Sequence, residues 1–450
     1  MLDVLLENAA YPDFKRKEMT KANIGIKDGK IDYIGTGNPE AEKNIDVTDR
    51  VVSPGFIDIH MHEENFAKEG AEYVISQMML EMGVTTAVGG NCGLQNQDLS
   101  YFKSVINSLK GSPVNYLMLA GYNQFRYELG VGRYEAATET QREKIRKMIK
   151  RELNEGAIGI SFGIEYDPGI IHDEMIFAAN AIEGDNYLVA AHYRSDCIKN
   201  IDSIKEMINF AQEIPMKFQI SHLSSCSAMG WMSESLAAIN EAMEKNHRLN
   251  YDTYPYNAFS TSMGSAVFDD GCLEAWGKDY DSILLTGEPY KNVFCSKEIF
   301  EDARKNYPGM LAVAFVMNEH EIAEAIKNKN GMIASDAIIN NGNGHPRAAG
   351  TFPRVLGKYV RQEKQLTMVD ALRKMTLEPA ERLNLKAKGR IEIGCDGDLT
   401  IFNPETIIDG ATFENIKVQP EGIDYVFVDG KLALDHKVTV NGRLGKFIRA

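Results

Sequence analysis

Long apolar runs are missing from this sequence. No segment approaches the roughly 20 consecutive apolar residues that are needed to cross a bilayer. The first residues, MLDVLLENAAYPDFKRKEM, carry Asp3 and Glu7 inside their apolar stretch. They do not resemble a signal peptide, which has a basic segment ahead of an uninterrupted apolar one. We therefore expect neither a membrane protein nor a secreted one.

The sequence has few cysteines, and it has fewer basic residues than acidic ones. The six cysteines show no CxxC spacing and no pattern of a small disulfide-bonded domain, so a reducing cytoplasm is the simplest location. Acidic residues outnumber basic ones by 64 to 49, for a net charge of −15, and no basic run with interleaved aromatics occurs. Because a net negative charge repels the phosphate backbone of a nucleic acid, we expect no nucleic-acid partner. With 44% hydrophobic residues, the composition is that of an ordered globular protein.

Both ends of the chain show the alternating pattern of short antiparallel strands. Near the start it is seen in ANIGI, before the turn KDGK, and in IDYIGTGN. Near the end it is seen in LTIFNP, IDYVFVDGKLAL and KVTVNGRLG. Strand-rich ends that flank a different middle favour one small β-sandwich domain, built from residues 1–53 and 386–450.

The middle of the chain, residues 54–385, alternates short apolar strands with longer helical patterns. AEYVISQMMLEMG, for example, has apolar residues at helical spacing and stops at Gly83, a good residue to follow a helix. Eight strands are predicted, at residues 55–60, 84–89, 114–121, 157–162, 187–192, 217–222, 248–254 and 331–336. This number of βα units predicts an α/β protein with a (β/α)₈ TIM-like barrel. The connection from about residue 257 to 330 is too long for one helix, so we expect an insertion that covers the barrel mouth.

Residues with metal-binding side chains lie at the ends of these strands, where such barrels carry their catalytic groups. They are His60, His62, Cys92, His192, His222 and Asp336. Imidazole, thiolate and carboxylate donors suit zinc, and six are more than one tetrahedral ion needs, which favours two metal positions. Each residue alone has a plain structural explanation, such as a core histidine, a buried thiol or a helix cap. Their joint placement is what predicts a metal centre.

The motifs around these residues resemble a known family. VVSPGFIDIHMH is similar to the opening barrel strand of the amidohydrolase superfamily, and GVTTAVGGNCG narrows the resemblance. Together with AIGISFGIEYDPG, NYDTYPY and HPRAAGTFPRVLG, it resembles the D-aminoacylase (N-acyl-D-amino-acid deacylase) family over nearly the whole chain. The resemblance implies a zinc-dependent hydrolase that acts on the carbon–nitrogen amide bond of a small N-acyl compound.

The resemblance also implies how the metal ligands divide. Cys92, His192 and His222 match the family's tightly held zinc site. His60 and His62 match the ligands of a neighbouring position that is only partly occupied.

Further residues match the family's catalytic and substrate-binding positions. Asp336 matches the catalytic aspartate, which exchanges protons with water and with the leaving amine. Arg347 matches a residue that grips the α-carboxylate of the substrate, and Tyr166 and Tyr254 lie in stretches that line the substrate pocket.

Some positions depart from the family pattern. The family usually has His-His-Lys after the sixth strand, whereas His222 is followed here by Leu-Ser-Ser, so a cation near the substrate is missing. Cys226 lies just beyond and is close enough in sequence to approach the pocket. These changes leave the acyl group, the side chain and the D or L configuration of the amino acid open, and the sequence also leaves open whether a homo-oligomer forms.

Two other functions compete with this one. Cyclic-amide hydrolases of the dihydroorotase or hydantoinase kind share the barrel and the HxH motif, but they typically use a carboxylated lysine from the fourth strand, and AIGISF has none. A metal-binding relative without catalysis would not need Asp336, since four closed ligands satisfy a structural zinc.

Overall fold

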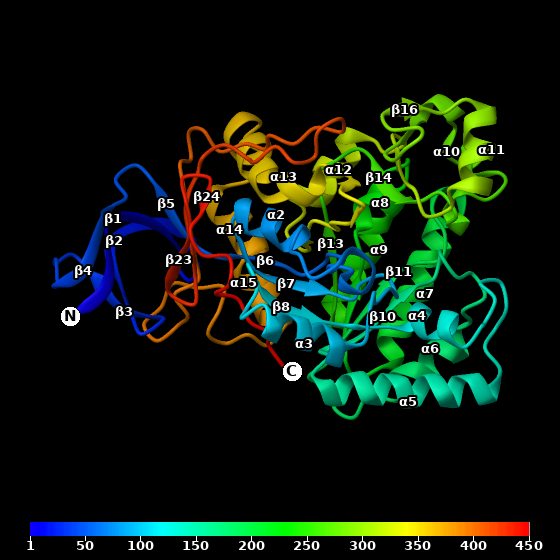
Figure 1. Cartoon of the computed structure of the whole chain (residues 1–450), viewed down its shortest axis with the longest axis horizontal. Helices are drawn as coiled ribbons and strands as arrows, with labels where there is room; N and C mark the ends of the chain where they lie inside the picture. Colours follow the sequence, from blue (N-terminus) through cyan, green and yellow to red (C-terminus); the bar gives the residue numbers. More distant parts are fainter. Residues whose placement is uncertain (450) are drawn as a thin grey trace.

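Parallel strands form the barrel, and each falls on a segment predicted to be a strand. They are β6 (Phe56–Asp58), β7 (Val84–Gly89), β8 (Asn115–Met118), β10 (Gly159–Gly163), β11 (Leu188–His192), β12 (Lys217–Ile220), β13 (Leu249–Thr253) and β18 (Met332–Ile333). The short β9 (Ala120–Gly121) continues the path of β8 beside β10. The computed structural model, which describes residues 1–449, confirms the (β/α)₈ barrel (Figure 1).

The barrel closes between its first and last strands, along a seam that also carries part of the predicted site. The Asp336 N–H donates to the His60 carbonyl, and the His62 N–H donates to the Ala337 carbonyl, both at 2.8 Å. Beneath these bonds, the buried Asp58 carboxylate accepts hydrogen bonds from the backbone N–H of Ser335, at 3.0 Å, and from its hydroxyl. The seam therefore joins two segments from opposite ends of the barrel sequence.

Strand periodicity divides side chains between the barrel interior and the helix layer. In β11, Leu188 and Ala190 belong to an apolar cluster formed inside the barrel. Val189 and Ala191, on the other face, pack in the larger cluster that includes the helices. Because side chains alternate along a strand, His192 follows on the interior face and ends the strand at the mouth.

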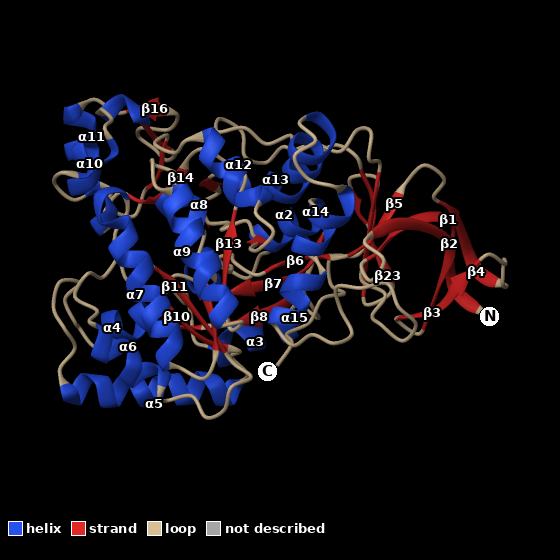
Figure 2. Cartoon of the chain, turned by 180° about the vertical axis from the view of Figure 1, so that it is seen from behind, coloured by secondary structure: helices blue, strands red, loops and turns tan. Residues whose placement is uncertain are grey.

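Helices cover the outside of the barrel (Figures 1 and 2). The main ones are α2 (Ile75–Glu81), α3 (Leu99–Ser108), α5 (Glu139–Glu155), α6 (His172–Ala179), α7 (Asn200–Glu213), α9 (Met232–Lys245), α12 (Glu319–Lys327) and α14 (Met368–Met375). In α5, Thr138 and Gln141 form a capping box, Ile145 and Ile149 are buried on one face, and Gly156, at φ 109°, ends the helix. Among residues 1–449, no helix combines the length and apolar character that a membrane crossing requires.

The predicted insertion follows β13 and contains its own small sheet. The sheet has the order β14 (Phe259–Ser262), β17 (Leu311–Ala314), β15 (Ile283–Leu285) and β16 (Val293–Phe294). It is accompanied by α10 (Cys272–Trp276) and α11 (Lys297–Asn306), which lie at the end of the molecule away from the β domain (Figure 1).

Both chain ends meet in one nine-stranded sheet, as predicted for the β domain. The N-terminal strands are β1 (Leu2–Asp13), β2 (Glu18–Lys27), β3 (Lys30–Gly35), β4 (Ala41–Asp46) and β5 (Val51–Pro54); the C-terminal ones are β21 (Leu399–Phe402), β22 (Ile423–Val428), β23 (Lys431–Asp435) and β24 (Val438–Thr439). Their order is β24-β23-β22-β21-β5-β1-β2-β3, with β4 beside β1. The Ile31 N–H, at the far edge, donates to the Cys395 carbonyl just before β21. The two faces of the expected sandwich are therefore parts of one sheet that folds over a shared core.

A fully buried ion group joins α4 (Tyr122–Glu128) to α6 and generates a stability prediction. Arg126 pairs with Glu174 and lies 3.4 Å from Asp167, and all three side chains are 0% exposed. Arg126→Ala leaves two buried carboxylates without a countercharge, so we expect the free energy of unfolding to fall by about 3–5 kcal/mol.

Denaturation in urea measures this change. The matched control is Arg146→Ala, which removes an exposed pair with Glu143 and should change the free energy of unfolding by less than about 1 kcal/mol. Equal effects of the two variants would contradict the importance of burial.

Candidate metal centre

The predicted metal-binding residues gather at the carboxyl ends of barrel strands. His60 and His62 follow β6, Cys92 follows β7, His192 ends β11, His222 follows β12 and Asp336 follows β18. Because parallel strands of a barrel end at one rim, each strand delivers its side chain to the same mouth.

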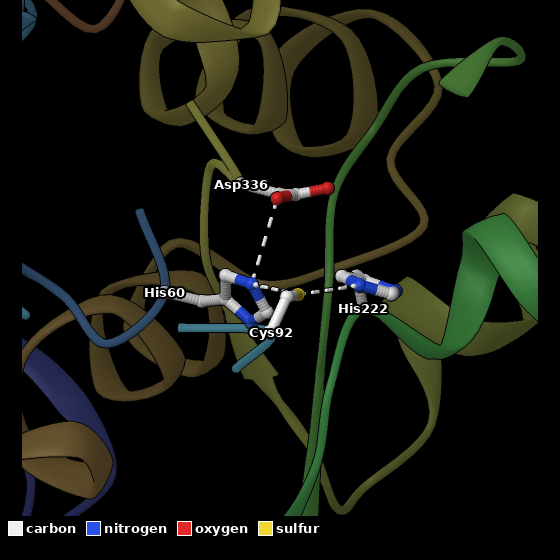
Figure 3. A group of neighbouring side chains, drawn as sticks. All are labelled: His60, Cys92, His222 and Asp336. Atoms are coloured by element: carbon white, nitrogen blue, oxygen red, sulfur yellow. Dashed lines mark hydrogen bonds and ion pairs between the residues drawn. The ribbon is translucent and has the colours of Figure 1, made fainter. Parts of the chain in front are cut away.

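Four of these residues form one tight group, shown in Figure 3 and called here the first donor group. The ligand atoms of His60, Cys92, His222 and Asp336 all lie within 4.8 Å of one another, and all four residues are buried. Cys92 Sγ is 3.3 Å from Nε2 of both histidines, and His60 Nε2 is 3.5 Å from an Asp336 oxygen. With zinc–ligand bonds of about 2.0–2.3 Å, tetrahedral neighbours lie about 3.3–3.6 Å apart, so these spacings suit one shared ion.

Three of the four donors have a strained backbone. Cys92 (φ 53°), His222 (φ 32°) and Asp336 (φ 50°) occupy the left-handed region that residues other than glycine avoid. Each such conformation costs on the order of 1–3 kcal/mol and persists only where the surrounding structure enforces it, commonly at functional sites. Strain at three converging donors indicates that the fold holds them for a function.

Buried polar partners orient the two imidazoles. Asp252, in β13, lies 3.2 Å from His60 Nδ1 and accepts a 2.7 Å hydrogen bond from the backbone N–H of His222. His222 Nδ1 is 2.7 Å from Ser225 Oγ. Both Nε2 atoms therefore face Cys92, and the outer contacts fix the ring orientations, as they do for metal-binding histidines generally.

Burial and neighbouring charges set the protonation of the donors. Burial raises the pKa of Cys92, but the charges of His60 and His222 outweigh it and hold that pKa well below its ordinary value. Burial also raises the pKa of Asp336, which the Arg347 guanidinium, 2.9 Å away, and His222 then lower below the usual range. Thiolate and carboxylate are the forms that bind metals, so the first donor group fits zinc.

His62 and His192 lie outside the first donor group. His62 Nε2 is 3.3 Å from Asp336. Burial lowers the pKa of His62, and the hydrogen bond to Asp336 and the neighbouring Cys92 reverse this and raise it to about 9. His192 Nε2 is instead 2.7 Å from the Glu165 carboxylate and 3.6 Å from Cys226 Sγ.

Two carboxylates beside His192 were not predicted as site residues. Glu165 lies two residues beyond β10, and Asp196 lies four beyond β11. Both carry the strand-end signal that identified the other donors. Burial, followed by the charge of Glu165, raises the pKa of Asp196 well above its ordinary value.

A small cavity of about 20 Å³ lies beside the donors and has room for about one water. The barrel contributes Glu165, Tyr166, His192, Asp196, His222, Ser225, Cys226 and Asp336 to its wall, and the insertion contributes Phe259, Ser260, Thr261 and Val267. The segment predicted as an insertion therefore forms part of the wall of this cavity.

Arg347, at the start of α13 (Arg347–Arg354), is buried behind this cavity. Its Nη2 lies 2.9 Å from Asp336, and its guanidinium stacks over the Tyr254 ring, 4.7 Å from the ring centre. Within residues 1–449, its Nε and Nη1 have no hydrogen-bond partner. Because buried N–H groups are normally paired, these two nitrogens are available to a hydrogen-bond acceptor.

The two predicted pocket tyrosines have different positions. Tyr166 lines the cavity and packs against His192, with 4.7 Å between the ring centres. Tyr254 lies beneath Arg347, is fully buried, and does not belong to the cavity wall.

Comparison with known proteins identifies the class. Two sequence models, both described as amidohydrolase family, match residues 51–255 and 293–433. The first range contains His60, Cys92 and His222, and the second contains Asp336 and Arg347. The chain belongs to the amidohydrolase family.

Relatives that match nearly the whole chain include deacylases of N-acyl-D-amino acids. The chain is 28% identical to the D-aminoacylase of Alcaligenes xylosoxydans xylosoxydans over 95% of this chain and 93% of that protein. A D-aminoacylase structure described for its binuclear metal centre has a TM-score of 0.88 and 26% identity, over 100% of both chains. An N-acyl-D-glutamate deacylase from Bordetella bronchiseptica, complexed with zinc and a phosphonate inhibitor, shares the fold with a TM-score of 0.88 at 24% identity, also over 100% of both chains. The chain is a member of the D-aminoacylase family.

Cys92→Ala removes the sulfur of the first donor group and tests that group directly. We expect the variant to lose about one zinc ion per chain relative to the parent, because a soft donor to the ion is gone. Elemental analysis after dialysis measures the loss, and Cys295→Ala, which removes a buried thiol of the insertion, is the control that should keep the full zinc content. Full zinc content in Cys92→Ala would show that Cys92 is only a packed thiol.

Proposed function

We propose that the chain is a zinc-dependent hydrolase that cleaves the amide bond of an N-acyl-D-amino acid, or of a related N-acyl compound, to a carboxylate and a free amine. The observation that carries this proposal is the position of Asp336. Its carboxylate faces His60 and His62 on one side and Arg347 on the other.

Asp336 is the group that moves the proton. Zinc, when bound, lowers the pKa of a coordinated water from about 15.7 towards 7 and polarises the scissile carbonyl. The lowered pKa keeps Asp336 ionised, which is the form that can accept the proton of the attacking water. It then donates that proton to the leaving amine. His62, 3.3 Å away, holds the carboxylate in place.

Arg347 binds the α-carboxylate of the substrate. Its Nη1, which has no hydrogen-bond partner, can donate to a carboxylate oxygen, and such a charged hydrogen bond orients the amide. The Tyr254 ring beneath the guanidinium restricts its rotation. Tyr166 contacts the substrate from the cavity wall.

The same proposal covers location and partners. We place the protein in the cytoplasm, acting on a small molecule without a nucleic-acid partner. Its six cysteines are free thiols, as a reducing compartment favours. The net charge of −15 disfavours polyanions.

A panel of paired D- and L-N-acyl amino acids tests the reaction itself. We expect release of free amine from the D compounds, loss of that activity on treatment with a chelator, and recovery when zinc is added back. Hydrolysis of dihydroorotate or hydantoins in place of the panel would instead favour a cyclic-amide hydrolase.

Asp336→Asn tests the proton transfer. The amide keeps the shape of the side chain but cannot accept a proton, so kcat should fall by about 10²- to 10⁴-fold. Circular dichroism should remain that of the parent, and the zinc content should fall less than in Cys92→Ala, because an amide oxygen can still bind the ion and the other three donors are unchanged. A variant with normal turnover would rule out the acid–base role.

Arg347→Met tests carboxylate binding. Loss of a charged hydrogen bond, about 1.5–3 kcal/mol, should lower kcat/KM for N-acyl amino acids by about 10- to 100-fold. The control is an N-acyl amine without the carboxylate, on which parent and variant should be equally slow. An equal loss on both substrates would show that Arg347 acts only through Asp336.

A further inference from the structure

The cavity beside the donors has two carboxylates in its wall, Glu165 and Asp196, called here the carboxylate pair. One oxygen of each and a ring nitrogen of His192 all lie within 4.8 Å of one another. Glu165 follows β10, Asp196 lies in the loop after β11, and these two strands are hydrogen-bonded neighbours. Because their carboxyl ends meet at the barrel mouth, the fold holds two acidic side chains at one point of the cavity wall.

We propose that the carboxylate pair binds a positively charged group of the substrate, an ammonium or a guanidinium. The inference rests on the proposed deacylase function and adds the substrate class. That class is an N-acyl amino acid that carries a cation, either on its side chain or on its acyl group, in addition to the α-carboxylate.

The carboxylate pair has no countercharge from the chain. Among residues 1–449, no lysine or arginine forms an ion pair with Glu165 or Asp196. Arg194, two residues before Asp196, is committed to Glu206 at 2.7 Å and to two backbone carbonyls. The basic residue nearest in sequence is therefore not available to the pair.

Asp196 gives independent evidence of a missing partner. It is only 9% exposed, and within the described chain its Oδ1 has no hydrogen-bond partner. An unpaired carboxylate oxygen that is buried is energetically costly, so this atom is suited to a donor that a ligand brings. The Glu165 side chain remains 14% exposed and can reach the same ligand from the cavity wall.

A zinc ion in the first donor group does not supply the missing charge. The Cys92 thiolate and the Asp336 carboxylate already match the two positive charges of such an ion. His192 Nε2 lies 2.7 Å from Glu165, whereas its Nδ1 has no partner in residues 1–449 and stays available for the zinc site that the resemblance implies. A histidine that binds a metal is a neutral imidazole, so His192 does not neutralise the pair either.

The rest of the cavity wall suits an organic cation. Tyr166 and Phe259 also line the cavity, and aromatic faces attract ammonium and guanidinium groups. The segment after His222 has Leu-Ser-Ser in place of the family's lysine, so it adds no positive charge. A substrate with an acidic side chain would therefore meet like charge here, and a cationic one would meet opposite charge.

The carboxylate pair and Arg347 lie beside different donors. Arg347 is 2.9 Å from Asp336, whereas Glu165 is 2.7 Å from His192. His222 belongs to the first donor group with Asp336 and packs against His192, with 4.5 Å between the ring centres. A substrate whose amide lies at the donors can thus reach Arg347 with its α-carboxylate and the carboxylate pair with its cation.

Matched substrates test the charge preference. Nα-acetyl-D-lysine and N-acetyl-D-norleucine differ by the ammonium group of the side chain, and glycyl-D-norleucine places an ammonium on the acyl group. We expect kcat/KM for one of the two cationic compounds to exceed that for N-acetyl-D-norleucine by about 10- to 100-fold, as a charged hydrogen bond allows. Preference for the lysine compound assigns the cation to the side chain, and preference for the glycyl compound assigns it to the acyl group.

Glu165→Gln and Asp196→Asn each remove one charge and keep the shape of the side chain. Each should lower the ratio of the two kcat/KM values by about tenfold and retain the zinc content of the parent. The matched control is Glu183→Gln, which removes a carboxylate that is 88% exposed and pairs with Lys150. Because Glu183 lies on the surface, this variant should keep the ratio of the parent.

Three outcomes would overturn the inference and leave the deacylase function standing. They are equal kcat/KM for N-acetyl-D-norleucine and both cationic compounds, a preference that survives in both variants, and loss of zinc from both variants. The last would make the carboxylate pair metal ligands.

Binding to the zinc-loaded parent separates the inference from the reaction. If none of the three compounds is hydrolysed, the deacylase function fails, and calorimetric titration still tests the carboxylate pair. One of the cationic compounds should then bind at least about tenfold more tightly than N-acetyl-D-norleucine. Equal binding of all three would overturn the inference.

Discussion

The hydrogen-bonded seam between β6 and β18 is the contact on which the rest of the site depends. Asp58 accepts two hydrogen bonds from Ser335, and the Asp336 N–H donates to the His60 carbonyl. The two strands come from opposite ends of the barrel sequence, so these bonds close the barrel. The same closure places His60 Nε2 3.5 Å from an Asp336 oxygen.

The candidate metal centre contains several side chains whose burial is energetically unfavourable. Cys92 and Asp336 are held in their charged forms, and both, with His222, have left-handed backbone. Arg347 balances part of the charge from behind, and a metal ion would balance more of it from the mouth. These donors come together only in the folded barrel, so a metal ion bound by them would also stabilise the fold.

The segment after His222 shows how a local departure changes the chemistry of a shared barrel. Where the family pattern has a lysine, this chain has the short helix α8 (Leu223–Ser227). From α8, Ser225 contacts His222 Nδ1 and Cys226 approaches His192. In place of that lysine, a hydroxyl and a thiol face His222 and His192.

The sequence by itself determined the barrel and the four residues of the first donor group. Strand and helix periodicity are local properties, and a donor at the end of a parallel strand must reach the common rim, so His60, Cys92, His222 and Asp336 could be found without coordinates. The order of strands in the β domain was not predictable, because pairing β5 with β21 is a contact between segments that are remote in the chain. Only the tertiary structure decided that His192 turns towards Glu165 and Cys226, and that Tyr254 lies under Arg347. Such choices depend on side-chain conformation and on the packing of neighbouring strand ends, which no spacing in a sequence records.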